Sequence, residues 1–251
     1  KLSLQGKRIA IIGKNCYEWV LSYVSILGGV GVVVPLDKGL QEPEIESCME
    51  RSYADAIIFV GGISSSLEGE EMGVKYPGFR NGDRTNIDLP QVQKNMMKAL
   101  KETGKPVIFV LCSGSTMALS WEDKNMDAIL QAWYPGQAGG TAVADVLQVA
   151  VNPAGRLPLT FYASSDDLPD FENYNMSEGQ GRTYRYFKGK PLYPFGHGLS
   201  YTGFSYSKAK LSKKSMRVND SVFLSLNLKN TGLRDGDEVV QVYIRNLQDP
   251  E

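Results

Sequence analysis

Apolar runs and helix-like segments alternate through the first two thirds of the chain. The runs that predict buried strands are residues 7–13, 31–36, 54–60, 106–112 and 128–133. The segments with helical spacing of apolar residues are 17–27, 43–52, 88–102 and 139–147. We expect Asp88 to cap the third of these helices, with Pro90 in its first turn. Strand alternating with helix is typical of an α/β fold, a mostly parallel sheet with helices on both faces.

The pattern changes twice in the second half. After a further extended segment at 157–161, residues 166–202 are rich in aromatic residues, glycine and proline and have little periodicity. We expect an ordered arm there, because its rings provide apolar surface to bury. Alternation with a period of two then predicts an all-β unit with strands at 204–211, 222–228 and 239–244. The expected units are an α/β domain (1–165), the arm (166–202) and a truncated β domain (203–251).

A long acidic loop follows the third predicted strand. It runs over residues 61–84 and contains several charged side chains: Glu68, Glu70, Glu71, Asp83 and Arg84. Ligand sites of open α/β sheets lie at the carboxyl ends of strands, and long loops in compact domains are usually functional or disordered. Clustered carboxylates near an arginine suit general acid/base chemistry. A solvated acidic surface loop is the alternative.

Composition narrows the classes of function. The chain is 42% hydrophobic and 22% charged, with a net charge of −1, so it lacks the basic surplus of nucleic-acid-binding proteins. Its cysteines are widely spaced and indicate neither a disulfide framework nor a zinc site: Cys16, Cys48 and Cys112. The single histidine, His197, argues against multi-histidine metal sites. No apolar run is long enough to span a membrane, and no signal-peptide pattern is present, which leaves cytoplasm and periplasm both open.

Three short motifs favour structural roles. His197 lies in a glycine-flanked turn and is expected to pack or to form hydrogen bonds. The glycine-containing triplets at 113–115 and 139–141 could cradle an anion, but tight turns and a helix start are the preferred interpretation.

From about residue 57 onward, several stretches carry a specific resemblance when taken together. They include FVGGISSSLEGEEM, GFRNGDRTNIDLPQVQ, AWYPGQAGGTAVADVL, NPAGRLPLTFY, GRTYRYFKGKPLYPFGHGLSYTGFSYS and NTGLRDGDEVVQVYIR. The chain resembles glycoside hydrolase family 3 of the β-xylosidase/β-glucosidase type. The resemblance implies a three-layer α/β sandwich with a mostly parallel sheet, followed by the start of a fibronectin-III-like β-sandwich.

The first 56 residues carry a different resemblance. IIGKNCYEWVLSYVSILGGVGVVVPLDKGL and EIESCMERSYADAIIF are similar to the N-terminal part of AMP-forming long-chain acyl-CoA synthetases. One hypothesis is a chimera joined near residues 57–60, since two parallel strand–helix units can share one sheet. A natural but divergent family 3 member is the alternative. The segment has no phosphate-binding loop followed by lysine, so ATP-dependent adenylation is not supported.

The family 3 resemblance implies a retaining β-glycosidase that acts on terminal β-D-xylosyl or β-D-glucosyl residues without a cofactor. Retaining enzymes use two carboxylates, a nucleophile and an acid/base. The Glu-x-Glu pattern makes Glu70 the first choice for the acid/base and Glu68 the second, with Glu71 the third carboxylate of the cluster. Asp83 and Arg84 are expected to pair and shape the loop, or to contact the sugar.

The nucleophile of the family lies on a preceding (β/α)₈ barrel, which needs about 250 residues of its own and has no counterpart in this chain. We therefore expect the chain to be inactive alone and to need a barrel domain and a β-linked xylo- or gluco-oligosaccharide as partners. The two other hypotheses are a non-catalytic α/β scaffold and a fragment of an acyl-CoA ligase.

Overall fold

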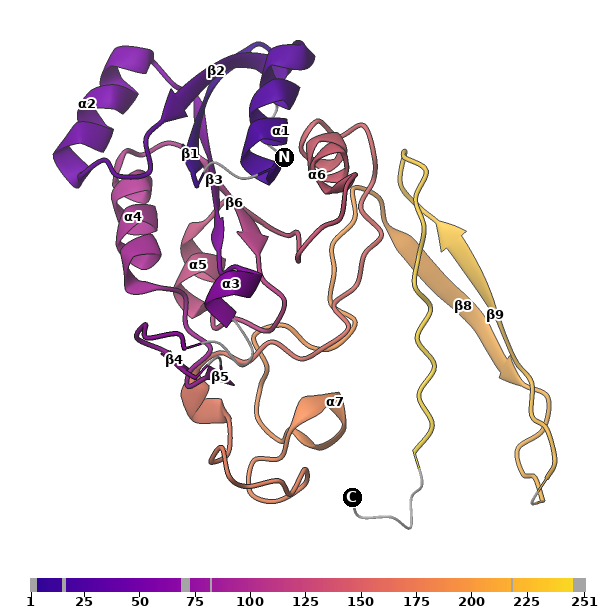
Figure 1. Ribbon diagram of the computed structural model, residues 1–251. Helices are drawn as coiled ribbons and strands as arrows, with labels where there is room; N and C mark the ends of the chain where they lie inside the picture. The colour runs from indigo at the N-terminus through magenta and orange to yellow at the C-terminus, as the bar shows by residue number, and fades with distance from the viewer. Residues whose placement is uncertain (1–3, 15–16, 69–72, 82, 218, 246–251) are drawn as a thin grey trace.

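A parallel sheet forms the centre of the computed structural model, which describes residues 4–14, 17–68, 73–81, 83–217 and 219–245 (Figure 1). The five strands lie in the order β2-β1-β3-β6-β7 and all pair in parallel. They are β1 (Lys7–Gly13), β2 (Gly31–Leu36), β3 (Ala56–Gly62), β6 (Val107–Cys112) and β7 (Ala128–Gln131). The predicted α/β class is confirmed.

Helices cover both faces of the sheet (Figure 1). α1 (Tyr17–Ser25) and α6 (Gly139–Leu147) lie on one face, and α2 (Glu42–Ser52) and α4 (Gln91–Glu102) on the other. The helix predicted at 17–27 ends earlier, in a π-helical turn at Ile26–Val30. Two short helices were not predicted because they span too few turns for a period to appear: α3 (Ser65–Glu68) and α5 (Ser120–Asn125).

Strand β3 shows why the sheet is buried on both sides. Ile57 and Phe59 point into the core shared with α2 and α4, whereas Ile58 and Val60 point into the core shared with α1 and α6. All four side chains are at most 4% exposed. Because successive residues of a strand face opposite sides, a strand buried on both sides must be apolar throughout. Each such side chain contributes about 1.5–3 kcal/mol to the free energy of unfolding.

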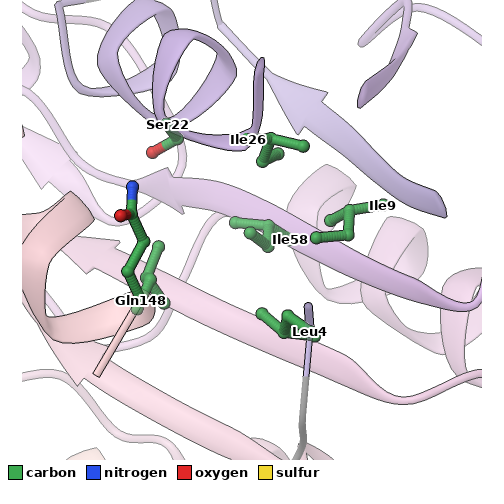
Figure 2. A pocket seen from close by; sticks show the side chains of 7 residues that line it. Leu4, Ile9, Ser22, Ile26, Ile58 and Gln148 are labelled. Carbon is green, nitrogen blue, oxygen red and sulfur yellow. The ribbon is translucent and has the colours of Figure 1, made fainter. Parts of the chain in front are cut away.

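The core between α1 and the sheet is close-packed. A void of about 10 Å³ remains there, about the volume that one water molecule occupies. Figure 2 shows the side chains around it: Leu4, Ile9, Ser22, Ile26, Ile58, Leu147 and Gln148. The void is too small for an organic ligand.

The first 56 residues are part of the same sheet. β1 lies between β2 and β3, and it pairs with β3 in parallel from Ile9 opposite Ala56 to Gly13 opposite Val60. The N-terminal unit therefore packs in register against the rest of the domain. Whether it shares an origin with the acyl-CoA synthetases stays a hypothesis.

Helix α4 starts later than predicted, and Asp88 is not its N-cap. The cap position is Pro90, and the helix begins at Gln91. Asp88 instead has an extended backbone, because it forms a parallel bridge with Ala118. Its carboxylate accepts a hydrogen bond from Lys94 Nζ at 2.7 Å. A tertiary bridge has therefore displaced the start of the helix by two residues.

The arm contains only two short helical turns, η2 (Ser165–Asp167) and α7 (Thr183–Tyr186). Part of it is fastened by aromatic rings, as predicted. Phe187 packs edge-on against Tyr162 at 4.9 Å between ring centroids, and a bridge joins Phe161 to Tyr193. The expectation that the rings of the arm are buried fails for Tyr174, which is 84% exposed.

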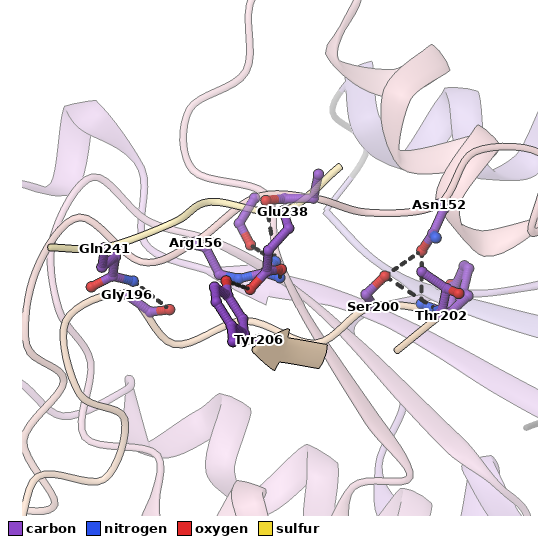
Figure 3. Close-up of polar contacts among 11 residues, drawn as sticks. Asn152, Arg156, Gly196, Ser200, Thr202, Tyr206, Glu238 and Gln241 are labelled. Carbon is purple, nitrogen blue, oxygen red and sulfur yellow. Dashed lines mark hydrogen bonds and ion pairs between the residues drawn. The ribbon is translucent and has the colours of Figure 1, made fainter. Parts of the chain in front are cut away.

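The final segment contains an antiparallel hairpin of β8 (Phe204–Leu211) and β9 (Leu224–Asn230). The strand expected at 239–244 is absent, since this segment has no ladder partner among the described residues. Side chains hold it instead (Figure 3). Arg156 Nη2 contacts Glu238 Oε2 at 2.6 Å, and the Tyr206 hydroxyl donates to Glu238 Oε1 at 2.8 Å. Gln241 Nε2 donates to the Gly196 carbonyl oxygen at 3.3 Å.

Candidate functional site

The acidic loop leaves the sheet at the carboxyl end of β3, and two features fix its exit. Gly62 has a φ of +121°, and a Cβ atom there would lie 1.9 Å from the Cys112 carbonyl oxygen, so only glycine fits. The Gln93 side chain of α4 then holds the Gly62 backbone at both ends. Gln93 Oε1 accepts from the Gly62 N–H at 2.7 Å, and Nε2 donates to the Gly62 oxygen at 2.6 Å. The start of the loop is therefore rigid.

Among the described residues of the loop, Glu68 is a carboxylate with hydrogen bonds to both of its oxygens. It ends the one-turn helix α3, which begins after Ser64, whose hydroxyl accepts from the Leu67 N–H. Glu68 Oε1 accepts a hydrogen bond from Ser115 Oγ at 2.6 Å. Glu68 Oε2 accepts a short one from the Tyr134 hydroxyl. Both carboxylate oxygens are thus engaged by loops that follow β6 and β7.

Arg84 completes this cluster from the other side. It lies in β5 (Asp83–Arg84), which pairs with β4 (Phe79–Arg80). Its Nη1 donates to Ser115 Oγ and to the Thr116 carbonyl oxygen, each at 2.8 Å. Burial lowers the pKa of the Arg84 guanidinium, and the negative charge of Glu68 opposes that shift. Ser115 therefore links the arginine to the carboxylate.

The guanidinium of Arg84 has unused hydrogen-bonding capacity. Its Nε and Nη2 atoms are buried and have no hydrogen-bond partner in the part of the chain that the structure describes. Buried donors of this kind are uncommon and call for an explanation. They can donate hydrogen bonds to an acceptor that approaches the loop.

Tyr134 is held in its neutral form by the same cluster. Burial raises the pKa of its phenol above the ordinary value of 10.0, and the hydrogen bond to Glu68 raises it further. Gly114 permits the close approach, because a Cβ atom there would lie 2.7 Å from the Tyr134 ring. The phenol therefore stays a hydrogen-bond donor to the carboxylate at neutral pH.

The other predicted site residues fall into two groups. Glu70 and Glu71 lie outside the described residues. Asp83 is described, exposed, and forms no ion pair with Arg84, so the expected pairing is wrong. Neighbouring residues of a strand point in opposite directions, and Arg84 takes the inward one.

Sequence analysis missed Tyr134 and assigned Ser115 only to a turn. Ser115 follows the carboxyl end of β6, which pairs with β3, and Tyr134 follows the carboxyl end of β7, the next strand beyond β6. That shared position was the available signal. The 113–115 triplet forms a bend, with Ser113 Oγ donating to the Ser115 carbonyl oxygen at 3.0 Å. The 139–141 triplet starts α6.

His197 has the packing role that was predicted. Its ring stacks on Tyr193 at 4.8 Å between centroids, and burial lowers its pKa. Among the described residues, no group of three or more His, Cys, Asp or Glu side chains could hold a metal ion. Nor does any described helix have both the length and the apolar character needed to cross a membrane.

Comparison with known proteins assigns the fold and the loop to a family. The model of the glycosyl hydrolase family 3 C-terminal domain matches residues 2–201. The chain belongs to this family. The match covers the sheet, the acidic loop and the arm of this family 3 domain, and it includes the segment that resembles acyl-CoA synthetases. The predicted family resemblance is thereby confirmed.

Relatives of the family 3 domain are much longer proteins. A xylan 1,4-β-xylosidase from Xylanibacter ruminicola is 49% identical over 223 residues, which is 89% of this chain and 25% of the relative. A periplasmic β-glucosidase from Salmonella typhimurium is 38% identical over 80% of this chain and 26% of its own length. A solved β-glucosidase from Erythrobacter marinus superposes with a TM-score of 0.72 at 25% identity, covering 94% of this chain and 37% of that one.

Proposed function

We propose that this chain is the acid/base-bearing part of a retaining β-glycosidase, with Glu70 as the acid/base. The catalytic partner in this proposal is a carboxylate nucleophile on a (β/α)₈ barrel. The substrate is a β-linked xylo- or gluco-oligosaccharide, from which a terminal β-D-xylosyl or β-D-glucosyl residue is released. Relatives that are named β-xylosidases and β-glucosidases support this assignment.

The observation that carries the proposal is the way Glu68 is held. A general acid must reach the glycosidic oxygen of the substrate, within about 2.6–3.2 Å. Both oxygens of Glu68 are already engaged, by Ser115 and Tyr134. Glu68 is therefore suited to anchor the loop. Of the two remaining carboxylates, Glu70 and Glu71, the Glu-x-Glu pattern favours Glu70 as the group that protonates the leaving sugar.

The chemistry then follows in two steps. Glu70 donates its proton to the glycosidic oxygen while the nucleophile attacks the anomeric carbon and forms a glycosyl–enzyme intermediate. The Glu70 carboxylate next removes a proton from water, which attacks that intermediate and releases the sugar. The unpartnered donors of Arg84 suit a hydroxyl group of the sugar or the acid/base carboxylate. Asp83, exposed on β5, is the lesser candidate for a sugar contact.

The test joins this chain to the N-terminal part of a family 3 relative as one polypeptide and measures hydrolysis of an aryl β-xyloside and an aryl β-glucoside. We expect turnover by the joined protein and none by the 251-residue chain alone. Glu70→Gln should lower kcat at least about 10²-fold with an alkyl xyloside, whose poor leaving group needs protonation. With an activated aryl xyloside, whose leaving group departs without protonation, azide should restore part of the activity of Glu70→Gln, because this anion attacks the glycosyl–enzyme intermediate without a general base.

Glu68→Gln is the matched variant in this experiment. It should reduce activity less than Glu70→Gln and should not respond to azide. If Glu68→Gln instead shows the larger loss and the azide response, the roles of the two residues are reversed. A well-folded joined protein with no turnover would favour the non-catalytic scaffold.

A further inference from the structure

A polar cleft lies between α4, α5 and residues 163–164, which precede the arm, and it is separate from the Glu68 cluster. Its volume is about 340 Å³, at the lower end of the range for small-molecule sites. Its lining is mostly polar and includes Asp88, Gln91, Lys94, Trp121, Glu122 and Ser164. Family membership and the proposed acid/base chemistry account for none of these side chains.

Glu122 is the most unusual residue of the cleft. It is 1% exposed, yet its Oε1 atom has no hydrogen-bond partner among the described residues. The charges that act on its carboxyl group are those of Lys94, Asp88 and Lys98, all of which line the cleft. Glu122 itself also lines the cleft. A buried carboxyl oxygen without a partner is costly, and a ligand donor would remove that cost.

The charges around the cleft exclude strongly charged ligands. Lys94 Nζ lies 2.7 Å from Asp88 Oδ1, so these two charges already compensate each other. Glu122 and the ammonium group of Lys98 provide one further charge of each sign. The positive and negative charges of the cleft therefore balance, and neither an anion nor a cation gains a net electrostatic attraction here.

The donors and acceptors point to hydroxyl groups. The lysines only donate hydrogen bonds and an ionised carboxylate only accepts them, whereas a hydroxyl group does both. Trp121 adds an apolar ring at the wall, with Lys98 Nζ 5.9 Å from its centroid. We propose that this cleft binds a neutral polyhydroxylated ligand, a sugar or related polyol, through hydroxyl hydrogen bonds to Glu122 and Lys94 and contact with Trp121.

The experiment titrates the 251-residue chain with xylobiose and follows the indole N–H signal of Trp121 by NMR, assigned with Trp121→Phe. We expect a saturable shift of this signal. Glu122→Gln, which keeps the size of the side chain, should raise the Kd about five- to tenfold, because hydrogen bonds to charged groups are stronger than neutral ones. Gln91→Ala, on the exposed surface of α4, should raise it about threefold.

Val92→Ala is the matched control, since Val92 adjoins Gln91 on the helix, is 64% exposed and does not line the cleft. It should leave the Kd unchanged. Inorganic phosphate and glycylglycine test an anionic and a zwitterionic ligand, and tighter binding of either would overturn the proposal. So would the absence of a saturable shift up to about 50 mM xylobiose, or a Kd that both cleft variants leave unchanged.

Glu70→Gln separates this inference from the proposed function. If the cleft binds the sugar, xylobiose should still shift the Trp121 signal of this variant, with the same Kd as for the unaltered chain. If Glu70→Gln abolishes the shift, the sugar binds at the acidic loop, and the cleft proposal fails while the proposed function stands. The cleft can equally bind xylobiose in a chain whose joined form shows no turnover.

Discussion

Replacing Glu68 by alanine tests whether this residue holds the acidic loop. The substitution removes the hydrogen bonds from Ser115 Oγ and from the Tyr134 hydroxyl. It also removes the negative charge that opposes the lowered pKa of buried Arg84. The loop would lose its attachment to the turns after β6 and β7.

The expected cost follows from these contacts. A hydrogen bond to a charged group contributes about 1.5–3 kcal/mol when buried. Glu68 is only half-buried and Tyr134 is 40% exposed, so each contact belongs at or below the lower end of that range. We expect Glu68→Ala to lower the free energy of unfolding by roughly 2–3 kcal/mol, which corresponds to about 4–12 °C in Tm for a chain of this size.

Equilibrium unfolding in urea, followed by far-ultraviolet circular dichroism, measures this change. Tyr134→Phe should cost about 1–1.5 kcal/mol, because it removes one of the two contacts. Ser66→Ala is the control, since Ser66 is exposed on the same turn of α3, and it should stay within about 0.5 kcal/mol of the unaltered chain.

The double variant Glu68→Ala/Tyr134→Phe decides the interpretation. If the two residues act through their shared hydrogen bond, the double variant should be less destabilised than the sum of the single changes, by about 1 kcal/mol. Additive losses, or a Glu68→Ala variant as stable as the Ser66→Ala control, would refute the anchoring role and return Glu68 to the candidates for the acid/base.

Three further predictions concern other parts of the chain. Arg156→Ala should lower the free energy of unfolding, measured in urea, by about 2–3 kcal/mol, because it breaks an ion pair whose side chains, Arg156 and Glu238, are only 11% and 15% exposed. It should also make residues 203–245 more susceptible to proteolysis, and an unchanged rate of cleavage would contradict this prediction. Gly62→Ala should lower the free energy of unfolding by about 3 kcal/mol or more, because it adds backbone strain and a clash with β6. Gly104→Ala, where φ is +70° and no atom would contact the new Cβ, should lower it by only about 1–2 kcal/mol in the same urea experiment. Burial raises the pKa of Glu122 above 4.5, so the ionised carboxylate opposes folding. The free energy of unfolding of Glu122→Gln, relative to that of the unaltered chain, should therefore increase from pH 4 to pH 7. A difference between the two proteins that does not grow with pH would refute this prediction.

The local pattern determined most of the sheet. The strands at 7–13, 31–36 and 106–112 were predicted to within one residue, because each is a short, largely apolar run that is distinct from the helical spacing around it. The family was also within reach of sequence analysis, since its motifs are stretches of consecutive residues. Glu68 and Arg84 were named as site residues for the same reason.

Tertiary structure decided what those residues do. Ser115 and Tyr134 lie 47 and 66 positions from Glu68, and only the order of β3, β6 and β7 in the sheet brings them to its two oxygens. Arg84 turned away from its neighbour Asp83 because the pleat of β5 separates them. The chain carries the chemical groups in its sequence, but long-range pairing selects which groups meet, since contact across the sheet depends on strand order and not on spacing along the chain.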